Sequence, residues 1–167
     1  MAVKYGSKNE ERARQAYVAA QQTNHPGLTC HPIGFVVYEC QPFLVASPDG
    51  LVQDPNSIPQ NGLLEIKCLF VARSGMTAKE CTEHKSSCLS PTFLLKPSHE
   101  YFYQIQVAMH VCQLSWCDFC VWAPGFLVSN RVNRDDVFLT EVLQKLNTFY
   151  FSHLLPALSA ESAAFTS

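Results

Sequence analysis

The stretch Gly62-Leu-Leu-Glu-Ile-Lys-Cys-Leu-Phe70 places two charged side chains inside an apolar run. The run from Leu63 to Cys68 predicts a buried β-strand. Glu65 and Lys67 are two positions apart, so on a strand their side chains point to the same face, while Ile66 points to the other. Charges in a nearly buried strand need partners or a function. The segment therefore predicts a central strand and a candidate site.

A third polar residue, Asp49, lies in the tight-turn sequence Ser47-Pro-Asp-Gly50 just past a predicted strand. Hard divalent cations prefer oxygen ligands, and two neighbouring carboxylates repel each other unless a cation neutralises them. Asp49, Glu65 and the carbonyl of Ile66 are thus candidate Mg²⁺ ligands, with Mn²⁺ expected to substitute. Lys67 beside the ion can activate water for phosphodiester hydrolysis. A Glu-x-Lys pair alone is typical of a solvated ion pair, and Asp49 alone of a turn; the apolar context favours a site.

The first part of the chain predicts a helix followed by a three-stranded meander. Strong helix formers fill residues 8–22, with an apolar face of Ala13, Ala16, Tyr17 and Ala20. The predicted strands cover residues 33–40, 43–46 and 63–68, and residues 54–62 are expected to form a loop.

The second part predicts two more helices and two more strands. Residues 71–97 lack periodicity, and a connection of that length is expected to be functional or partly helical. Ser98 is the predicted N-cap of a helix to about Cys112, with a core face of Tyr101, Ile105, Ala108, Met109 and Cys112. Strands are expected at 118–123 and 127–132. A final helix runs from Asp135 or Asp136 to about Leu155, with a buried side of Val137, Val142, Leu143, Leu146 and Phe149.

The predicted fold class is α/β of the α+β type, a mixed sheet flanked by helices, in one domain over residues 1–156 with a flexible tail over 157–167. With 167 residues, 47% hydrophobic and 16% charged, the chain can bury a core. No apolar run approaches the roughly 20 residues of a membrane helix, and no signal peptide is visible. We therefore expect an intracellular protein of the nucleus or cytoplasm, not secreted and without a membrane partner. The net charge of −2 leaves nucleic-acid binding open, because bound divalent ions supply local positive charge.

The eight cysteines are expected to be reduced and mostly buried. Cys117 and Cys120 form the one Cys-x-x-Cys pair, but on a strand they would face opposite sides, which disfavours a shared zinc ion. An iron–sulfur cluster with Cys112, Cys117, Cys120 and a distant partner is less favoured still.

Several segments, in this order, resemble the motifs of the phage lambda exonuclease / YqaJ-type viral recombinase family, part of the PD-(D/E)XK nuclease superfamily. They are Gly6–Glu10 with Arg12-Ala-Arg14 and Tyr17, then Ser47–Leu51, Gly62–Cys68, Tyr101–Val111 and the strand Trp116–Trp122. The resemblance runs from about Gly6 to at least Pro124. Any one of these motifs would be weak evidence for the family, whereas their occurrence in this order is specific.

The resemblance implies a role for each matching residue. Asp49, Glu65 and the Ile66 carbonyl would hold the catalytic Mg²⁺, and Lys67 would help to activate water. Gln104 would orient water or the scissile phosphate, and Glu10 would lie at the edge of the metal site, in reach of a second ion through water. Ser47 and Tyr101 would contact the substrate. Simpler roles stay open for some of them: Glu10 as a first-turn acid, Gln104 as an exposed helix residue and Ser47 as a turn former.

The implied activity is Mg²⁺-dependent digestion of linear duplex DNA from a 5′ end, in recombination or in viral or mobile-element DNA processing. Its implied partners are DNA, a single-strand annealing protein and further copies of the chain in a ring-shaped trimer. The phage enzyme's helix before the Glu10-like motif has no counterpart here, so a fragment or a different end recognition is expected. Two alternatives stay open: an inactive DNA-binding or assembly module with the nuclease fold, and an interaction domain stabilised by metal on the cysteines.

Overall fold

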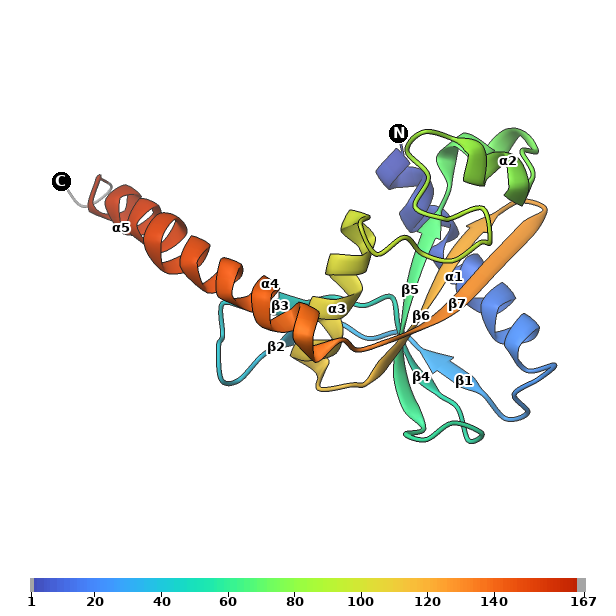
Figure 1. Cartoon of the computed structure of the whole chain (residues 1–167), viewed down its shortest axis with the longest axis horizontal. Coiled ribbons are helices and arrows are strands. Elements are labelled where there is room, and N and C mark those ends of the chain that lie inside the picture. The colour runs from blue at the N-terminus through green and yellow to red at the C-terminus, as the bar shows by residue number, and fades with distance from the viewer. Residues whose placement is uncertain (1, 165–167) are drawn as a thin grey trace.

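A computed structural model describes residues 2–164, and its centre is a five-stranded sheet (Figure 1). Its strands, in spatial order, are β1 (Thr29–His31), β4 (Gly50–Gln53), β5 (Asn61–Cys68), β6 (Trp116–Ala123) and β7 (Phe126–Asn133). Strands β5 and β6 are parallel, and the other neighbours are antiparallel. The mixed sheet with flanking helices confirms the predicted fold class.

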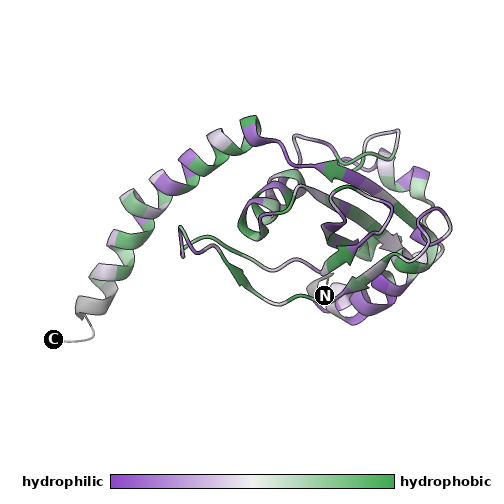
Figure 2. Cartoon of the chain, turned by 90° about the horizontal axis from the view of Figure 1, so that it is seen from below, coloured by the Kyte–Doolittle hydropathy of each residue, from purple (hydrophilic) through white to green (hydrophobic). Residues whose placement is uncertain are grey.

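Strands β5 and β6 carry mostly apolar residues on both faces, which is why they lie in the middle of the sheet. Every residue of β6 is buried, and Figure 2 shows hydrophobic (green) stretches in the strands beside hydrophilic (purple) ones. Gly62 lets the Trp116 ring lie directly on β5, because a Cβ at this position would fall 2.2 Å from the ring. The Trp116 indole also donates a hydrogen bond of 2.9 Å to the Pro59 carbonyl.

Helix α1 (Ala2–Gln21) covers one face of the sheet. Its buried Ala13 and Tyr17 pack on a cluster that includes Leu64 and Ile66 of β5. The helix starts earlier than the predicted residues 8–22.

Helix α3 (Glu100–Cys112) and helix α4 (Asp136–Phe149) belong to the opposite face. Ile105, Ala108 and Met109 of α3 are buried as predicted, but the N-cap is His99 and not Ser98. In α4 the residues that the structure buries are Leu139 and Val142.

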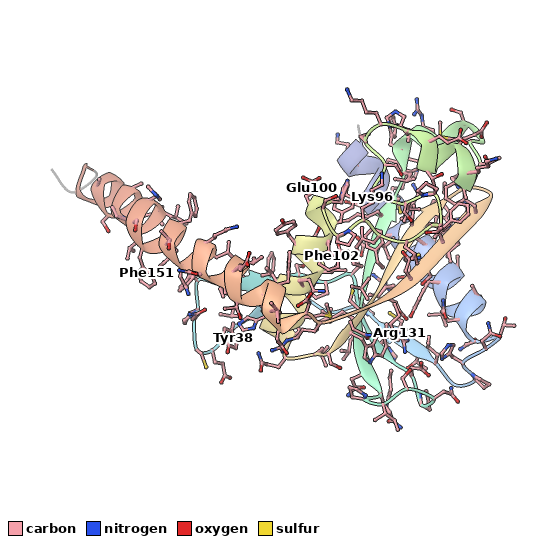
Figure 3. The ribbon with its side chains drawn as sticks, viewed as in Figure 1. Tyr38, Lys96, Glu100, Phe102, Arg131 and Phe151 are labelled. Atoms are coloured by element: carbon pink, nitrogen blue, oxygen red, sulfur yellow. The ribbon has the colours of Figure 1, made fainter. Side chains whose placement is uncertain are left out.

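The prediction that Val137 and Phe149 are buried was wrong, because these side chains are 80% and 55% exposed. Only one side of α4 packs against α3, and the C-terminal part of the helix extends away from it. It continues through a π-helical turn, η2 (Tyr150–Leu154), into α5 (Leu155–Ala164), and the three form an arm on which Phe151 lies (Figures 1 and 3). Pro156 explains the wider turn, because proline has no N–H for the carbonyl four residues earlier.

The predicted tail over 157–167 is helical as far as Ala164, and residues 165–167 lie outside the described part of the chain.

The predicted three-stranded meander was wrong. Val36–Val37 (β2) and Val45–Ala46 (β3) pair with each other in a separate ribbon, while β1 and β4 join β5 instead. Residues 71–97 are partly helical as expected, with η1 (Phe70–Ser74) and α2 (Ala78–Glu83).

A polar cluster around the buried Asp118 lies on the α1 face of the sheet, away from the candidate site. Asp118 on β6 accepts hydrogen bonds from the Tyr17 hydroxyl and from Arg131, which Figure 3 labels, at 2.5 Å and 2.9 Å. The Arg131 guanidinium also lies 3.6 Å from the centre of the Trp116 ring. The buried Asp118 carboxylate is thus paired with groups from α1 and β7, which links this helix to the sheet.

The cysteines are free thiols within the described residues, and Cys117 and Cys120 pack in the two clusters on opposite faces, as their spacing predicts. Across residues 2–164, no helix is long and apolar enough to cross a membrane.

Candidate active site

The register of β4 and β5 brings Asp49 next to Glu65. Gly50 pairs with Leu64, so continuing the antiparallel register by one position places Asp49 opposite Glu65. The Asp49 N–H donates to the Leu64 carbonyl at 3.1 Å, which fixes the turn just before β4. Gly50 is needed here, because a Cβ would lie 2.5 Å from the Cys30 sulfur. The Ser47–Gly50 turn thus holds a carboxylate beside the central strand, where its pairing with β4 stops.

The Asp49 side chain lies at the edge of β5, next to the point where β4 begins and beyond the last pair of the two strands. Its Oδ2 accepts a hydrogen bond of 2.6 Å from the Ile66 N–H. A strand residue directs its N–H and C=O to one edge, so the Ile66 carbonyl faces the same opening. The Ile66 side chain is buried against α1, as the alternation predicts. One carboxylate and one main-chain oxygen are therefore placed at the same edge.

Glu65, Lys67 and Gln104 form a compact hydrogen-bonded cluster on the α3 face. Lys67 Nζ lies 2.6 Å from Glu65 Oε1 and 3.0 Å from Gln104 Oε1, and Gln104 Nε2 donates to Glu65 Oε1 at 2.6 Å. The Lys67 ammonium also lies 4.3 Å from the centre of the Tyr101 ring. Residues 101 and 104 share a face of α3, so this helix presents both to the lysine.

The Glu65 carboxyl group is buried and that of Asp49 is half-buried, and the two repel each other. Burial, and then the charge of Glu65, raise the pKa of Asp49 to about 7, although the Ile66 N–H opposes this shift. Burial also raises the pKa of Glu65, which is 4% exposed, while Lys67 and Gln104 oppose the shift. The charge of Glu10 raises the pKa of both carboxyl groups. A cation beside these groups would relieve the cost of ionising them.

Glu10 is connected to this centre through Arg14, a residue that the sequence analysis did not select. Arg14 donates from Nε to the Asp49 carbonyl at 3.1 Å and from Nη2 to Glu10 Oε1 at 2.9 Å, and its Nη1 donates to Glu11. A signal was present in the sequence, because spacings of four from Glu10 and three from Tyr17 place Arg14 on the inner face of α1.

Two clefts meet at the cluster. One, of about 680 Å³, is lined by Glu10, Lys67 and Tyr101 together with parts of residues 68–100; the other, of about 470 Å³, is lined by Ser47, Glu65 and Gln104. The predicted substrate residues thus lie on different sides of the centre, Tyr101 in the first cleft and Ser47 in the second.

The donor set fits a hard divalent cation: two carboxylates whose ionisation is costly without one, and a main-chain oxygen at the same edge. The hydrogen bonds described above use one oxygen of each carboxylate. Within residues 2–164, no group of three or more His, Cys, Asp and Glu side chains is placed to hold a metal ion. Glu10 therefore stands at the edge of the centre and does not complete a three-carboxylate cluster.

Residues 1–115 match the family described as YqaJ-like viral recombinase domain, which confirms the resemblance of the motifs. The structure is similar to that of an alkaline exonuclease (LHK-Exo) from Laribacter hongkongensis and to that of the same protein in complex with dAMP. In both cases the TM-score is 0.69 at 24% identity, covering 98% of this chain and 75% of the other, which shows a shared fold. No curated protein sequence matches the chain significantly.

Proposed function

The chain belongs to the YqaJ-like viral recombinase domain family, and on this basis we propose that it is a metal-dependent exonuclease that hydrolyses linear duplex DNA. The observation that carries the proposal is the cluster of Glu65, Lys67 and Gln104 beside Asp49. A carboxylate pair and a main-chain oxygen that can hold a metal ion, with a lysine beside them, suit metal-dependent phosphodiester hydrolysis. The similar fold of an alkaline exonuclease supports the same activity.

Asp49, Glu65 and the Ile66 carbonyl would hold Mg²⁺, or Mn²⁺ in its place, with Glu10 in reach through water. The bound ion would neutralise charge on the scissile phosphate and lower the pKa of a coordinated water. Lys67, held by Glu65 and Gln104, would orient the attacking water and donate hydrogen bonds to the developing negative charge. The Gln104 amide would keep the Lys67 ammonium and the Glu65 carboxylate in fixed orientations.

The two clefts support a substrate path that passes the centre. Tyr101 would contact the nucleic acid on the first side, and Ser47 would donate to a phosphate on the second. The neighbouring exonuclease was crystallised with dAMP, which supports mononucleotides as products. The family resemblance favours digestion from a 5′ end, in recombination or in viral or mobile-element DNA processing. An annealing protein and a ring-shaped trimer are proposed partners on the same basis.

The test is digestion of a duplex labelled at one end, with Mg²⁺ or Mn²⁺. Linear duplexes with a 5′-phosphate or a 5′-hydroxyl are compared with closed circles and with single-stranded RNA. We expect release of the 5′ label as a mononucleotide from linear DNA, and loss of this release in Lys67→Ala but not in the exposed control Lys79→Ala. Circles cut as fast as linear DNA would exclude an exonuclease. DNA binding without cleavage would instead identify an inactive binding module.

A further inference from the structure

We propose that Arg14 is a positioning residue of the metal centre, which fixes the Glu10 carboxylate relative to the main chain of Asp49. The inference deepens the proposed function and rests on it. Arg14 reaches a carbonyl and two acids of its own helix, so it would act through Glu10 and Asp49 and not on the substrate.

Arg14 is buried, at 7% exposure, whereas Arg12 on the same helix is exposed over the Trp122 ring. Burying a guanidinium is costly unless its N–H groups are paired. In Arg14 all three nitrogens donate hydrogen bonds, to Asp49, Glu10 and Glu11. The paired guanidinium therefore holds these three groups in one arrangement.

The planar guanidinium connects two elements that carry the candidate ligands. Nε holds the Asp49 carbonyl at 3.1 Å, and Nη2 holds Glu10 Oε1 at 2.9 Å. The Asp49 main chain is fixed on its other side by the bond to Leu64. Because the guanidinium is rigid, the position of the Glu10 carboxylate is set relative to the sheet and not only by its own helix.

This restraint matters because Glu10 approaches two other carboxyl groups of the same charge. Without Arg14, Glu10 would be free to turn away from Asp49 and Glu65, which would weaken any contribution to the ion. Groups that orient metal ligands typically change metal affinity or activity by about 10–100-fold. If Arg14 only anchored α1 on the sheet, its substitution would lower the stability of the protein. The metal affinity of the folded protein would then stay unchanged.

The experiment measures Mn²⁺ affinity by electron paramagnetic resonance in the full chain, for Arg14→Lys, Arg14→Gln and the matched control Arg12→Gln. Circular dichroism identifies the variants that fold. Lysine keeps the charge but cannot span both contacts, so we expect Mn²⁺ affinity about tenfold weaker in both Arg14 variants and unchanged in the control. If Arg14→Gln does not fold, Arg14→Lys carries the comparison. Unchanged affinity in a folded Arg14→Lys would overturn the inference.

A double-mutant cycle with Glu10→Gln shows whether Arg14 acts through Glu10. We expect Arg14→Lys to weaken Mn²⁺ binding much less in the Glu10→Gln background, whereas additive losses would overturn the inference. A wild-type chain that binds Mn²⁺ but digests no DNA would contradict the exonuclease and leave the role of Arg14 standing. A wild-type chain that binds no Mn²⁺ would overturn both. If wild type digests DNA and Arg14→Lys binds Mn²⁺ as tightly as wild type does, the role of Arg14 is overturned and the exonuclease activity stands.

Discussion

Gln104 of helix α3 donates a hydrogen bond of 2.6 Å to Glu65 of strand β5, across 39 residues of sequence. The same amide accepts from Lys67 at 3.0 Å, so one neutral side chain orients both charged ones. The centre is therefore completed by a helix from outside the strand that carries the Glu-x-Lys pair.

Replacement of this amide should affect activity more than stability. We expect Gln104→Ala to lower kcat by about 10–100-fold, as is typical for groups that orient metal ligands, because Lys67 and Glu65 lose a common partner. Single-turnover digestion of linear duplex measures the effect. Gln15→Ala, an exposed glutamine of α1, is the control and should retain wild-type activity. Equal rates for both variants would contradict the orienting role.

Neutralising Asp49 should stabilise the metal-free protein at alkaline pH. With its pKa raised to about 7, the folded state keeps a proton that the unfolded state releases at lower pH, so stability falls as pH rises towards 7. In the Asp49→Asn variant the new side chain cannot ionise, yet its amide oxygen can still accept from the Ile66 N–H. We therefore expect a higher melting temperature for Asp49→Asn than for wild type at pH 8 without metal, and a smaller difference at pH 5.5. Thermal unfolding monitored by circular dichroism measures both, and the opposite trend with pH would contradict the prediction.

The affinity for a divalent metal ion should rise with pH, whereas the stability of the metal-free protein falls. The proton on Asp49 competes with the cation, so affinity for Mg²⁺ should fall by up to about tenfold per pH unit below 7. Calorimetric titration at pH 6, 7 and 8 measures this, and binding at pH 6 should release a proton into the buffer. Affinity that is independent of pH would exclude Asp49 as a titrating ligand.

Gly62 should be intolerant of a side chain because the Trp116 ring occupies its place. We expect Gly62→Ala to destabilise the protein by about 1–3 kcal/mol, the usual cost of overpacking a core, as measured by urea unfolding. Gly34→Ala is the control, because a Cβ there has no atom within 4 Å. A Gly62→Ala protein as stable as Gly34→Ala would show that β5 and Trp116 separate easily.

The shared face of Glu65 and Lys67 could be predicted from the sequence, whereas the order of the strands could not, for a physical reason. Glu65 and Lys67 share a face by the alternation of any strand, whereas β4 is four residues long and depends on pairing with residues 61–64. The residues of β2 and β3 have strong strand propensity, but propensity does not determine which partner they choose. Gln104 could be found from motif order, and its contact with Glu65 required the packing of α3. The spacing of Arg14 from Glu10 and Tyr17 places it on the inner face of α1, but its contact with the Asp49 carbonyl depends on how α1 packs on the sheet.

The decisive measurement for a metal-dependent centre is mononucleotide release from linear duplex DNA as a function of Mg²⁺ concentration, for wild type and for Glu65→Gln prepared in parallel. Glutamine keeps the shape of the side chain but removes its charge, so the variant should fold. We predict that wild type releases mononucleotides only with Mg²⁺ or Mn²⁺ and that Glu65→Gln is slower by at least about a hundredfold. Release that needs no divalent ion, or that is equal in both proteins, would contradict a metal-dependent centre at Glu65.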